Sequence, residues 1–257
     1  MDGLGQLEQQ THGRISLFGC QIDNLTLHEA VQKVESFVEQ GGTRRYFAVN
    51  IHKIVACRRS PEMRSIANRS DLVTADGQPI VWASRWFGRP LKSRVNGTDL
   101  MERLVDLASR KQYGIYLLGA RHEVLQAMIE QYRQRFPGLR VVGSRNGYWS
   151  DEEESSVVCA IREARPDILF VGISSPRKEL FMDRNLTQMQ VPFAMGVGGS
   201  FDVAAGVTQR APLWMQRTGL EWFWRVLQEP GRMWKRYLLD GIQFGFIVIR
   251  ALVSGAD

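Results

Sequence analysis

The sequence is poor in cysteine, and its few cysteines stand far apart. Among its 257 residues there are three, at positions 20, 57 and 159, with no CxxC pair and no cluster with histidine. The four histidines, His12, His28, His52 and His122, also lack the spacing of metal ligands. This pattern excludes a disulfide framework and a structural zinc site, and it fits a reducing cytosol.

Long hydrophobic runs are absent as well. The apolar run 242–249 is far shorter than the roughly 20 residues that cross a bilayer. Residues 1–13 are polar and contain Asp2 and Glu8, so they lack the charged and then apolar pattern of a secretion signal. With 44% hydrophobic and 23% charged residues, the composition excludes a polytopic membrane protein and a disordered chain. We expect a folded protein that is not exported.

Several nucleotide- and metal-binding motifs are also missing. The glycine-rich segment 196–200 matches neither GxGxxG nor the Walker pattern, which argues against a dinucleotide-dependent oxidoreductase. No Asp-x-Asp pair occurs, so a divalent metal held between such a pair and a nucleotide diphosphate is not expected. We therefore expect no cofactor and no metal, and predict that cationic side chains neutralise leaving-group charge.

Between residues 15 and 209, short apolar runs alternate with amphipathic segments. Six runs have the composition of strands: 15–18, 46–49, 72–75, 115–118, 168–171 and 193–197. Five segments between them have helical periodicity: 27–39, 98–109, 122–136, 150–163 and 177–189. The alternation predicts an α/β core, a Rossmann-like and mostly parallel sheet with helices on both faces. Residues 1–14 are expected to form an N-terminal tail.

Residues 210–257 differ in character and are predicted to form a helical, membrane-associating appendage that is separable from the core. They carry seven basic and four acidic residues, a net charge of +3 out of the chain's +6, and four of its seven tryptophans. Pro230 and Gly231 divide two predicted helices, 213–228 and 231–252. Cationic and indole side chains beside an apolar run favour contact with an anionic membrane surface. A helix packed on the core, or an oligomer contact, is the alternative.

Polar residues and glycines follow the predicted strands directly. In open α/β sheets, ligands bind beyond the carboxyl ends of the strands. The residues at these positions are therefore predicted to converge on one cleft; they include Asn50, Asp76, Gly119, Gly198 and Asp202. Asp76 has the chemistry of a general base for a bound hydroxyl. The Asp-Gly pair that it begins is also a common turn.

The segment 175–179 is a predicted helix start. Ser175 is expected to cap the helix and Pro176 to take its first position. Free N–H groups there, with Arg177 and Lys178, would favour a phosphate or carboxylate. A capped surface helix with solvated cations is the alternative.

Several strings, taken in order, resemble one enzyme family. They are TADGQPIVW (74–82), RVNGTDL (94–100), YLLG (116–119), GISSPRKE (172–179), GGSFD (198–202), RAPLWM (210–215) and GLEWFWR (219–225). Together they resemble the WecG/TagA/CpsF glycosyltransferases, glycosyltransferase family 26, over about residues 15 to 250. The resemblance implies an inverting hexosyl- or glycuronosyltransferase that moves a sugar from a UDP-sugar to a polyprenyl-diphosphate-linked saccharide. It also implies a peripheral location on the inner face of the cell membrane and a role in exopolysaccharide or other cell-surface polysaccharide synthesis.

The resemblance suggests roles for individual residues. Asp76 resembles the family's catalytic base. Donor- and nucleotide-binding roles are expected for Asn50, Arg94, Asn96, Gly119, Lys178, Glu179, Gly198 and Asp202. Arginines of the appendage are expected to close over the nucleotide diphosphate and to meet the membrane; these are Arg217, Arg225, Arg232 and Arg236.

Two positions depart from the family pattern. Ala48 stands where the family often has threonine, which removes one hydroxyl from the donor site. Lys178 stands where glutamine is common, and its added cation suggests a donor with a carboxylate, a uronic acid such as glucuronic acid. An N-acetylmannosamine-type sugar is the alternative donor.

Two other functions stay open on the residues alone. A nicotinamide-dependent oxidoreductase could use the same sheet topology. The basic, aromatic tail could stack on single-stranded nucleic acid, whereas the family resemblance implies no nucleic-acid partner. A homo-oligomer is compatible with any of these functions.

Overall fold

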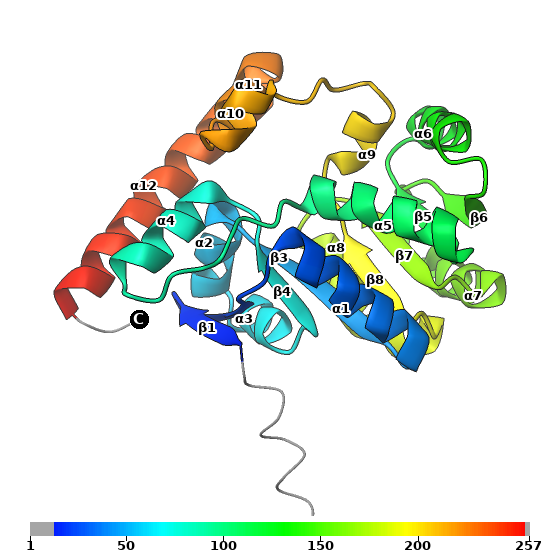
Figure 1. The fold of residues 1–257 in the computed structure, drawn as a ribbon, viewed down its shortest axis with the longest axis horizontal. Helices are drawn as coiled ribbons and strands as arrows, with labels where there is room; N and C mark the ends of the chain where they lie inside the picture. Colours follow the sequence, from blue (N-terminus) through cyan, green and yellow to red (C-terminus); the bar gives the residue numbers. More distant parts are fainter. Residues whose placement is uncertain (1–12, 255–257) are drawn as a thin grey trace, which may run out of the picture.

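The computed structural model describes residues 13–254, except for the side chains of residues 232, 233, 236 and 254. Its main sheet has six strands in the order β4-β3-β8-β7-β5-β6, and each pairing is parallel. The strands are β3 (Arg44–Val49), β4 (Leu72–Ala75), β5 (Gly114–Gly119), β6 (Arg140–Arg145), β7 (Ile168–Gly172) and β8 (Phe193–Gly196). Helices lie on both faces of this sheet (Figure 1). The predicted α/β architecture is confirmed.

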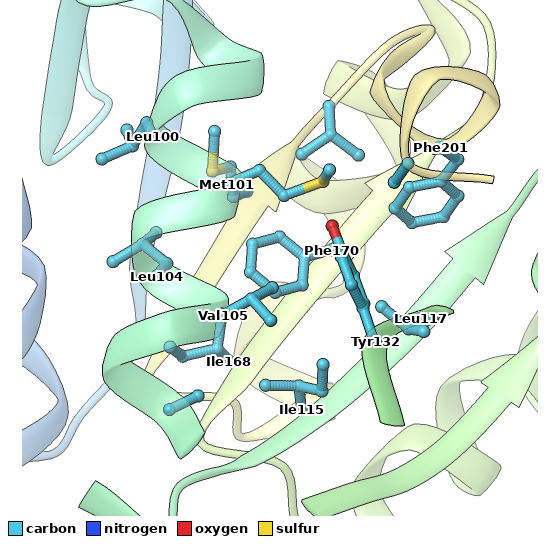
Figure 2. Close-up of a cluster of buried hydrophobic side chains, with 14 of the residues drawn as sticks. Leu100, Met101, Leu104, Val105, Ile115, Leu117, Tyr132, Ile168, Phe170 and Phe201 are labelled. Carbon is cyan, nitrogen blue, oxygen red and sulfur yellow. The ribbon is translucent and has the colours of Figure 1, made fainter. Parts of the chain in front are cut away.

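One face of the sheet is covered by α1 (Leu27–Gln40), α5 (Gly97–Lys111) and α6 (His122–Arg135). In α5, the buried Leu100, Leu104 and Leu107 recur every three to four residues, which gives the helix an apolar stripe. Figure 2 shows Val105 of the same helix beside Phe170 and Ile115 of the sheet, with Leu100 and Leu104 on the opposite flank of the helix. The short α9 (Ser200–Ala204) closes the same cluster through Phe201.

The other face is covered by α2 (Ile51–Arg59), α3 (Pro61–Asn68), α7 (Glu154–Ala164) and α8 (Arg177–Met189). Helices α2, α3 and α4 (Gln78–Trp86) were not predicted. Asn50 and Ser60 cap α2 and α3 with side-chain hydrogen bonds, so the capping residues were the available signal. The single-turn η2 (Asp151–Glu153) precedes α7 inside the predicted segment 150–163.

The first predicted strand does not join the main sheet. It forms β1 (Arg14–Leu17), which pairs antiparallel with β2 (Cys20–Asp23) in a separate hairpin. The hairpin turns at Phe18 and Gly19, both of which have positive φ, at 54° and 78°. Glycine adopts this backbone conformation at little cost, so the turn holds the two strands next to each other instead of sending the chain to the sheet.

The edge strand β6 was also missed. It begins and ends with arginine, and none of its residues is buried, so it lacks the apolar run by which the other strands were recognised. Polar side chains are common on edge strands, because they discourage pairing with another chain.

The C-terminal segment is helical, but the predicted helix 213–228 is divided into α10 (Leu213–Arg217) and α11 (Glu221–Gln228) at Gly219, whose φ is 76°. The last helix, α12 (Pro230–Ser254), packs on α2. That the segment is separable from the core stays a prediction. Phe244, Val248 and Ala251 are buried in the same apolar cluster as residues of β3 and β4. His52 Nδ1 of α2 also lies 2.8 Å from Asp240 Oδ2 of α12.

The other side of α12 is apolar and exposed. Leu239, Ile242, Phe246 and Ile249 have half or more of their surface in solvent. Among the described residues, none of the helices combines the length and the hydrophobicity needed to cross a membrane.

Candidate functional site

Asp76 lies directly after β4, at the carboxyl edge of the sheet, and its carboxylate is held on both oxygens. The backbone N–H of Gly97 donates to Oδ1 at 2.9 Å, and Asn50 Nδ2 donates to Oδ2 at 3.3 Å. The backbone N–H of Asp76 itself donates to the carbonyl of Val49 in β3. The side chain is half-buried, so it is oriented by its neighbours and still reachable from solvent.

Asn50 has its position because it starts α2. Its Oδ1 accepts from the backbone N–H of Lys53 at 3.1 Å, which leaves the amide NH₂ facing Asp76. The predicted convergence of the ends of β3 and β4 is therefore present in the structure.

A buried tyrosine lies close to this carboxylate. The Tyr46 and Thr74 hydroxyls hydrogen-bond at 2.8 Å inside the sheet. Burial and the negative charge of Asp76 raise the pKa of Tyr46 well above its usual value. Tyr46 is therefore a neutral neighbour of Asp76 at ordinary pH.

Arg94 and Asn96 lie on the loop that leads into α5. Asn96 caps this helix through the backbone N–H groups of Thr98 and Asp99, at 2.9 and 3.3 Å. Arg94 Nη1 lies 2.6 Å from Glu221 Oε2 of α11. The loop that carries both predicted donor-binding residues thus lies next to Asp76, because Gly97, the residue that follows this loop, donates to the Asp76 carboxylate.

The loop between β7 and α8 differs from its prediction. Ser175 is not the N-cap of α8; Pro176 takes that position and contributes no capping side chain. The backbone N–H of Lys178 donates to the carbonyl of Ser174, so it is not free for an anion. Arg177 stacks on the Trp149 ring at 4.3 Å and donates to the Trp149 carbonyl. Arg177 and Lys178 were the two cations expected at an anion site, and Arg177 is engaged by Trp149.

Lys53 completes this loop and was missed by sequence reasoning. Its ammonium is 2.5 Å from both Ser175 Oγ and Glu179 Oε1, although Lys53 and Glu179 are only 5% and 3% exposed. Burial lowers the pKa of Lys53 to about 8; the Glu179 carboxylate opposes this shift and the Lys178 ammonium adds to it. The sequence feature that could have pointed to Lys53 is its place three residues after Asn50, at the end of a predicted strand.

Glu179 is thus engaged inside the protein. Its Oε1 is bound by Lys53 and lies 3.8 Å from the Lys178 ammonium, while its buried Oε2 has no hydrogen-bond partner among the described residues. The expected donor-binding role of Glu179 would be exercised through this oxygen or through Lys178.

The glycine-rich segment after β8 lies next to Lys178 and to the appendage. A side chain at Gly198, where φ is 40°, would come within 3.7 Å of the Lys178 ammonium. A side chain at Gly199 would meet the Arg225 guanidinium at 3.6 Å. The backbone carbonyl of Asp202 accepts from the N–H groups of residues 207 and 208. The glycine-rich segment after β8 and helix α11 therefore meet at this point.

Gly119 has a packing reason to be glycine. Its φ is 137°, and a side chain would approach the carbonyl of Gly172 in β7 to 2.4 Å. Any side chain here would separate β5 from β7 at the edge where the other predicted residues gather.

The appendage arginines have different surroundings. Arg225 lines a small cavity between α5, α9 and α11, together with Thr98, Gln209, Arg210 and Glu221. Arg217 is exposed in the last turn of α10. The side chains of Arg232 and Arg236 lie outside the described part of the structure.

Exposed aromatic side chains occur on α4 as well as on the C-terminal segment for which the sequence predicted them. Trp82 and Trp86 of α4 are exposed like those of the tail, and a side chain at Gly219 would touch Trp82. In Figure 1, α4, α10, α11 and α12 lie on the same side of the molecule. We call this set the aromatic face: Trp82, Trp86, Trp214, Trp222, Phe223, Trp234 and Phe246.

Metal ligands do not gather at this edge of the sheet. Within residues 13–254, as far as their side chains are described, there is no group of three or more His, Cys, Asp or Glu residues that could hold a metal ion. The independence from metal stays a prediction.

Comparison with known proteins gives a consistent family match. A model of the glycosyl transferase WecG/TagA/CpsF family matches residues 15–257. A relative from Bacillus spizizenii is 35% identical over 180 residues, 70% of this chain and 69% of its own. Relatives from Bacillus subtilis and Staphylococcus aureus are 31% and 29% identical, over 84% and 89% of this chain and 80% and 89% of theirs. All three are named N-acetylglucosaminyldiphosphoundecaprenol N-acetyl-beta-D-mannosaminyltransferase.

Proposed function

Because the chain belongs to the WecG/TagA/CpsF glycosyltransferase family, we propose that it transfers a sugar from a UDP-sugar to a polyprenyl-diphosphate-linked saccharide, with inversion at the anomeric carbon. The acceptor class follows the names of its relatives, which act on an N-acetylglucosaminyl diphosphoundecaprenol. The observation that carries the proposal is the single carboxylate of Asp76, held by Asn50 and the Gly97 N–H at the carboxyl edge of the sheet.

In this mechanism Asp76 acts as the general base. Direct displacement needs one base to take the proton from the acceptor hydroxyl as its oxygen attacks the anomeric carbon. The bond from that carbon to the UDP oxygen breaks on the opposite side, and the departing diphosphate carries the negative charge. Arg94 and Arg225 are proposed to stabilise that charge, since arginine binds phosphate in a fork of N–H donors.

Lys178 supports a uronic acid as the transferred sugar. Its side chain is only 12% exposed, and its ammonium is 3.8 Å from Glu179, whose closer partner is Lys53 at 2.5 Å. The Lys178 charge is thus incompletely neutralised beside Gly198, where a carboxylate on the donor would pair with it. N-acetylmannosamine, the sugar in the relatives' names, is the competing donor.

The aromatic face supports docking on a lipid surface. Its tryptophans and phenylalanines are accompanied by the exposed cations Arg217 and Lys235. Indole rings favour the headgroup region, and cations favour anionic lipid. We propose that this face holds the enzyme on the inner surface of the cell membrane, where a polyprenyl-linked acceptor is embedded.

The function is tested by a donor screen with a short-chain polyprenyl-diphosphate acceptor, read by the mass of the product. UDP-glucuronate and UDP-N-acetylmannosamine are compared directly, each with and without EDTA. A product with either donor supports the transferase, and turnover that EDTA does not change supports metal independence. Preference for the neutral sugar would remove the uronic acid, and no product from any UDP-sugar would contradict the proposal.

A further inference from the structure

Helix α11 has two faces of opposite character. Trp222, Phe223 and Leu227 are exposed and belong to the apolar side. Glu221 and Arg225 are four residues apart and therefore lie on the same side of the helix, which faces the core. The position of one of these two charged side chains consequently constrains the other.

Glu221 joins this helix to the core through an alternating row of charges. Its Oε2 lies 2.6 Å from Arg94 Nη1 and 3.4 Å from Asn96 Nδ2. Its Oε1 lies 3.7 Å from Arg210 Nε, and Arg210 pairs with Asp99 of α5 at 2.6 Å. The Arg94 and Glu221 side chains are only 14% and 19% exposed, so solvent screens their attraction less than that of a surface pair.

One turn further along α11, Arg225 reaches the glycine-rich loop. Its guanidinium would meet a side chain at Gly199 at 3.6 Å, and Glu221 and Arg225 line the same small cavity. Glycine at 199 leaves the space that this guanidinium approaches. The connection from Arg94 through Glu221 therefore fixes how far Arg225 extends over the carboxyl edge of the sheet.

We propose that Glu221 is a positioning residue whose carboxylate clasps α11 to Arg94 and thereby places the Arg225 guanidinium over the Gly198–Asp202 loop, at the donor diphosphate. The identity of that anion rests on the proposed function, whereas the clasp itself does not. Arg94 keeps further N–H donors for a ligand, because a guanidinium has five and Glu221 engages one of them.

The clasp is tested first without any substrate, by hydrogen exchange in the full-length protein. Glu221→Gln removes the charge and keeps the size of the side chain. Exchange of the backbone amides in 221–228 is expected to accelerate at least tenfold, with amides of β5 and β7 unchanged. Glu62→Gln is the matched control, because Glu62 is an exposed first-turn glutamate of α3. Unchanged exchange in 221–228 would overturn the clasp even if the chain proved to have another activity.

The positioning role is tested by kinetics with the donor that the screen identifies. Glu221→Gln is expected to lower kcat/KM for the donor at least tenfold, while Glu62→Gln leaves it at the wild-type value. If Glu221 acts by placing Arg225, it has little left to contribute once Arg225 is Ala. The double variant should then be within about twofold of Arg225→Ala alone. If the double variant instead loses kcat/KM by the product of the two single-variant losses, the positioning role is overturned. If the wild-type protein shows no turnover with any donor, the proposed function is contradicted, and the exchange result still decides whether the clasp exists.

Discussion

At the residue scale, the carboxylate of Asp76 is oriented by two neighbouring groups that use only part of its hydrogen-bonding capacity. In the part of the chain that the structure describes, each oxygen accepts one hydrogen bond, Oδ2 from Asn50 and Oδ1 from the Gly97 N–H, although a carboxylate oxygen can accept more. The neutral Tyr46 adds no competing charge. The free lone pairs of a half-buried carboxylate are what a general base offers to an acceptor hydroxyl.

Replacement of Asp76 by alanine is expected to lower kcat by roughly 10²-fold or more, the usual size of a general-base contribution. The KM for the donor should change little, since the base acts on the acceptor hydroxyl. The control is Asp106→Ala, which replaces a partly exposed aspartate of α5 that pairs with Arg110, and it should retain full turnover. Initial rates over a range of donor concentrations measure both constants, and turnover of Asp76→Ala near that of the wild type would refute the assignment.

A second residue-scale feature is the buried pair of Lys53 and Glu179. The pair links the start of α2 to the first turn of α8, and Lys178 extends from the same cluster toward the glycine-rich loop. Removing one partner of a buried ion pair leaves the other charge uncompensated. The pair therefore also determines how stability depends on pH.

Lys53 is expected to make the protein more stable as pH rises above about 8. Its pKa falls from 10.5 to about 8 on folding, so between these values the unfolded chain binds more protons than the folded one. The free energy of unfolding then increases with pH, by at most about 1.4 kcal/mol per pH unit from this group. Lys53→Met lacks this titrating group. The free energy of unfolding of the wild type should therefore increase with pH relative to that of the variant. Urea unfolding between about pH 7 and pH 10 measures both, and parallel curves would contradict the lowered pKa.

At the scale of elements, α12 serves the core and the surface at once. Phe244, Val248 and Ala251 form the buried side, and Phe246 and Ile249 the exposed side. The alternation follows the helical period, because residues four apart share a face and a residue two positions away points elsewhere. One helix can thus complete the core cluster around β3 and β4 while presenting an apolar surface outward.

Two neighbouring phenylalanines of α12 should separate these roles. Phe244, 7% exposed, contacts Phe18 in the core, and Phe244→Ala is expected to destabilise the fold by about 3–5 kcal/mol. Phe246 is 69% exposed, and Phe246→Ala should change stability by less than about 0.5 kcal/mol. Urea unfolding of the two variants provides the comparison. Equal stability of both would mean that α12 is not part of the core in solution.

At the scale of the whole molecule, the aromatic face and the candidate site share their elements. α11 bears Trp222 and Phe223 on its exposed side and Glu221 and Arg225 on its inner side. A lipid surface bound at the aromatic face would therefore bring the head group of an embedded acceptor near the carboxyl edge of the sheet.

Binding to anionic vesicles is expected to depend on the aromatic face and to weaken as salt concentration rises, since the cations beside it are exposed. Phe246→Ser with Ile249→Ser should reduce the vesicle-bound fraction several-fold in a flotation assay. Tyr148→Ser is the control, because Tyr148 is as exposed as Phe246 but lies outside this face. Equal binding by both variants would exclude the face as the docking surface.

Much of the sheet could be predicted from apolar runs, because β3, β4, β5, β7 and β8 are buried on both sides and read as continuous hydrophobic segments. The elements that were not predicted correctly have local causes. The residues of β6 are polar at an edge, Phe18 and Gly19 turn the first strand into a hairpin, and α2 and α3 are short helices recognised better by their caps than by their periodicity.

The sequence by itself determined the α/β class and the positions of Asp76 and Asn50, because strand ends and parallel topology together bring successive strand-end residues to one edge. Only the tertiary structure decided the pairs of Lys53 with Glu179 and of Arg94 with Glu221, and the burial of one side of α12. Those partners are 126 and 127 residues apart in the chain, and local periodicity holds no information about contacts across such distances. They are set by how the finished helices pack against the sheet.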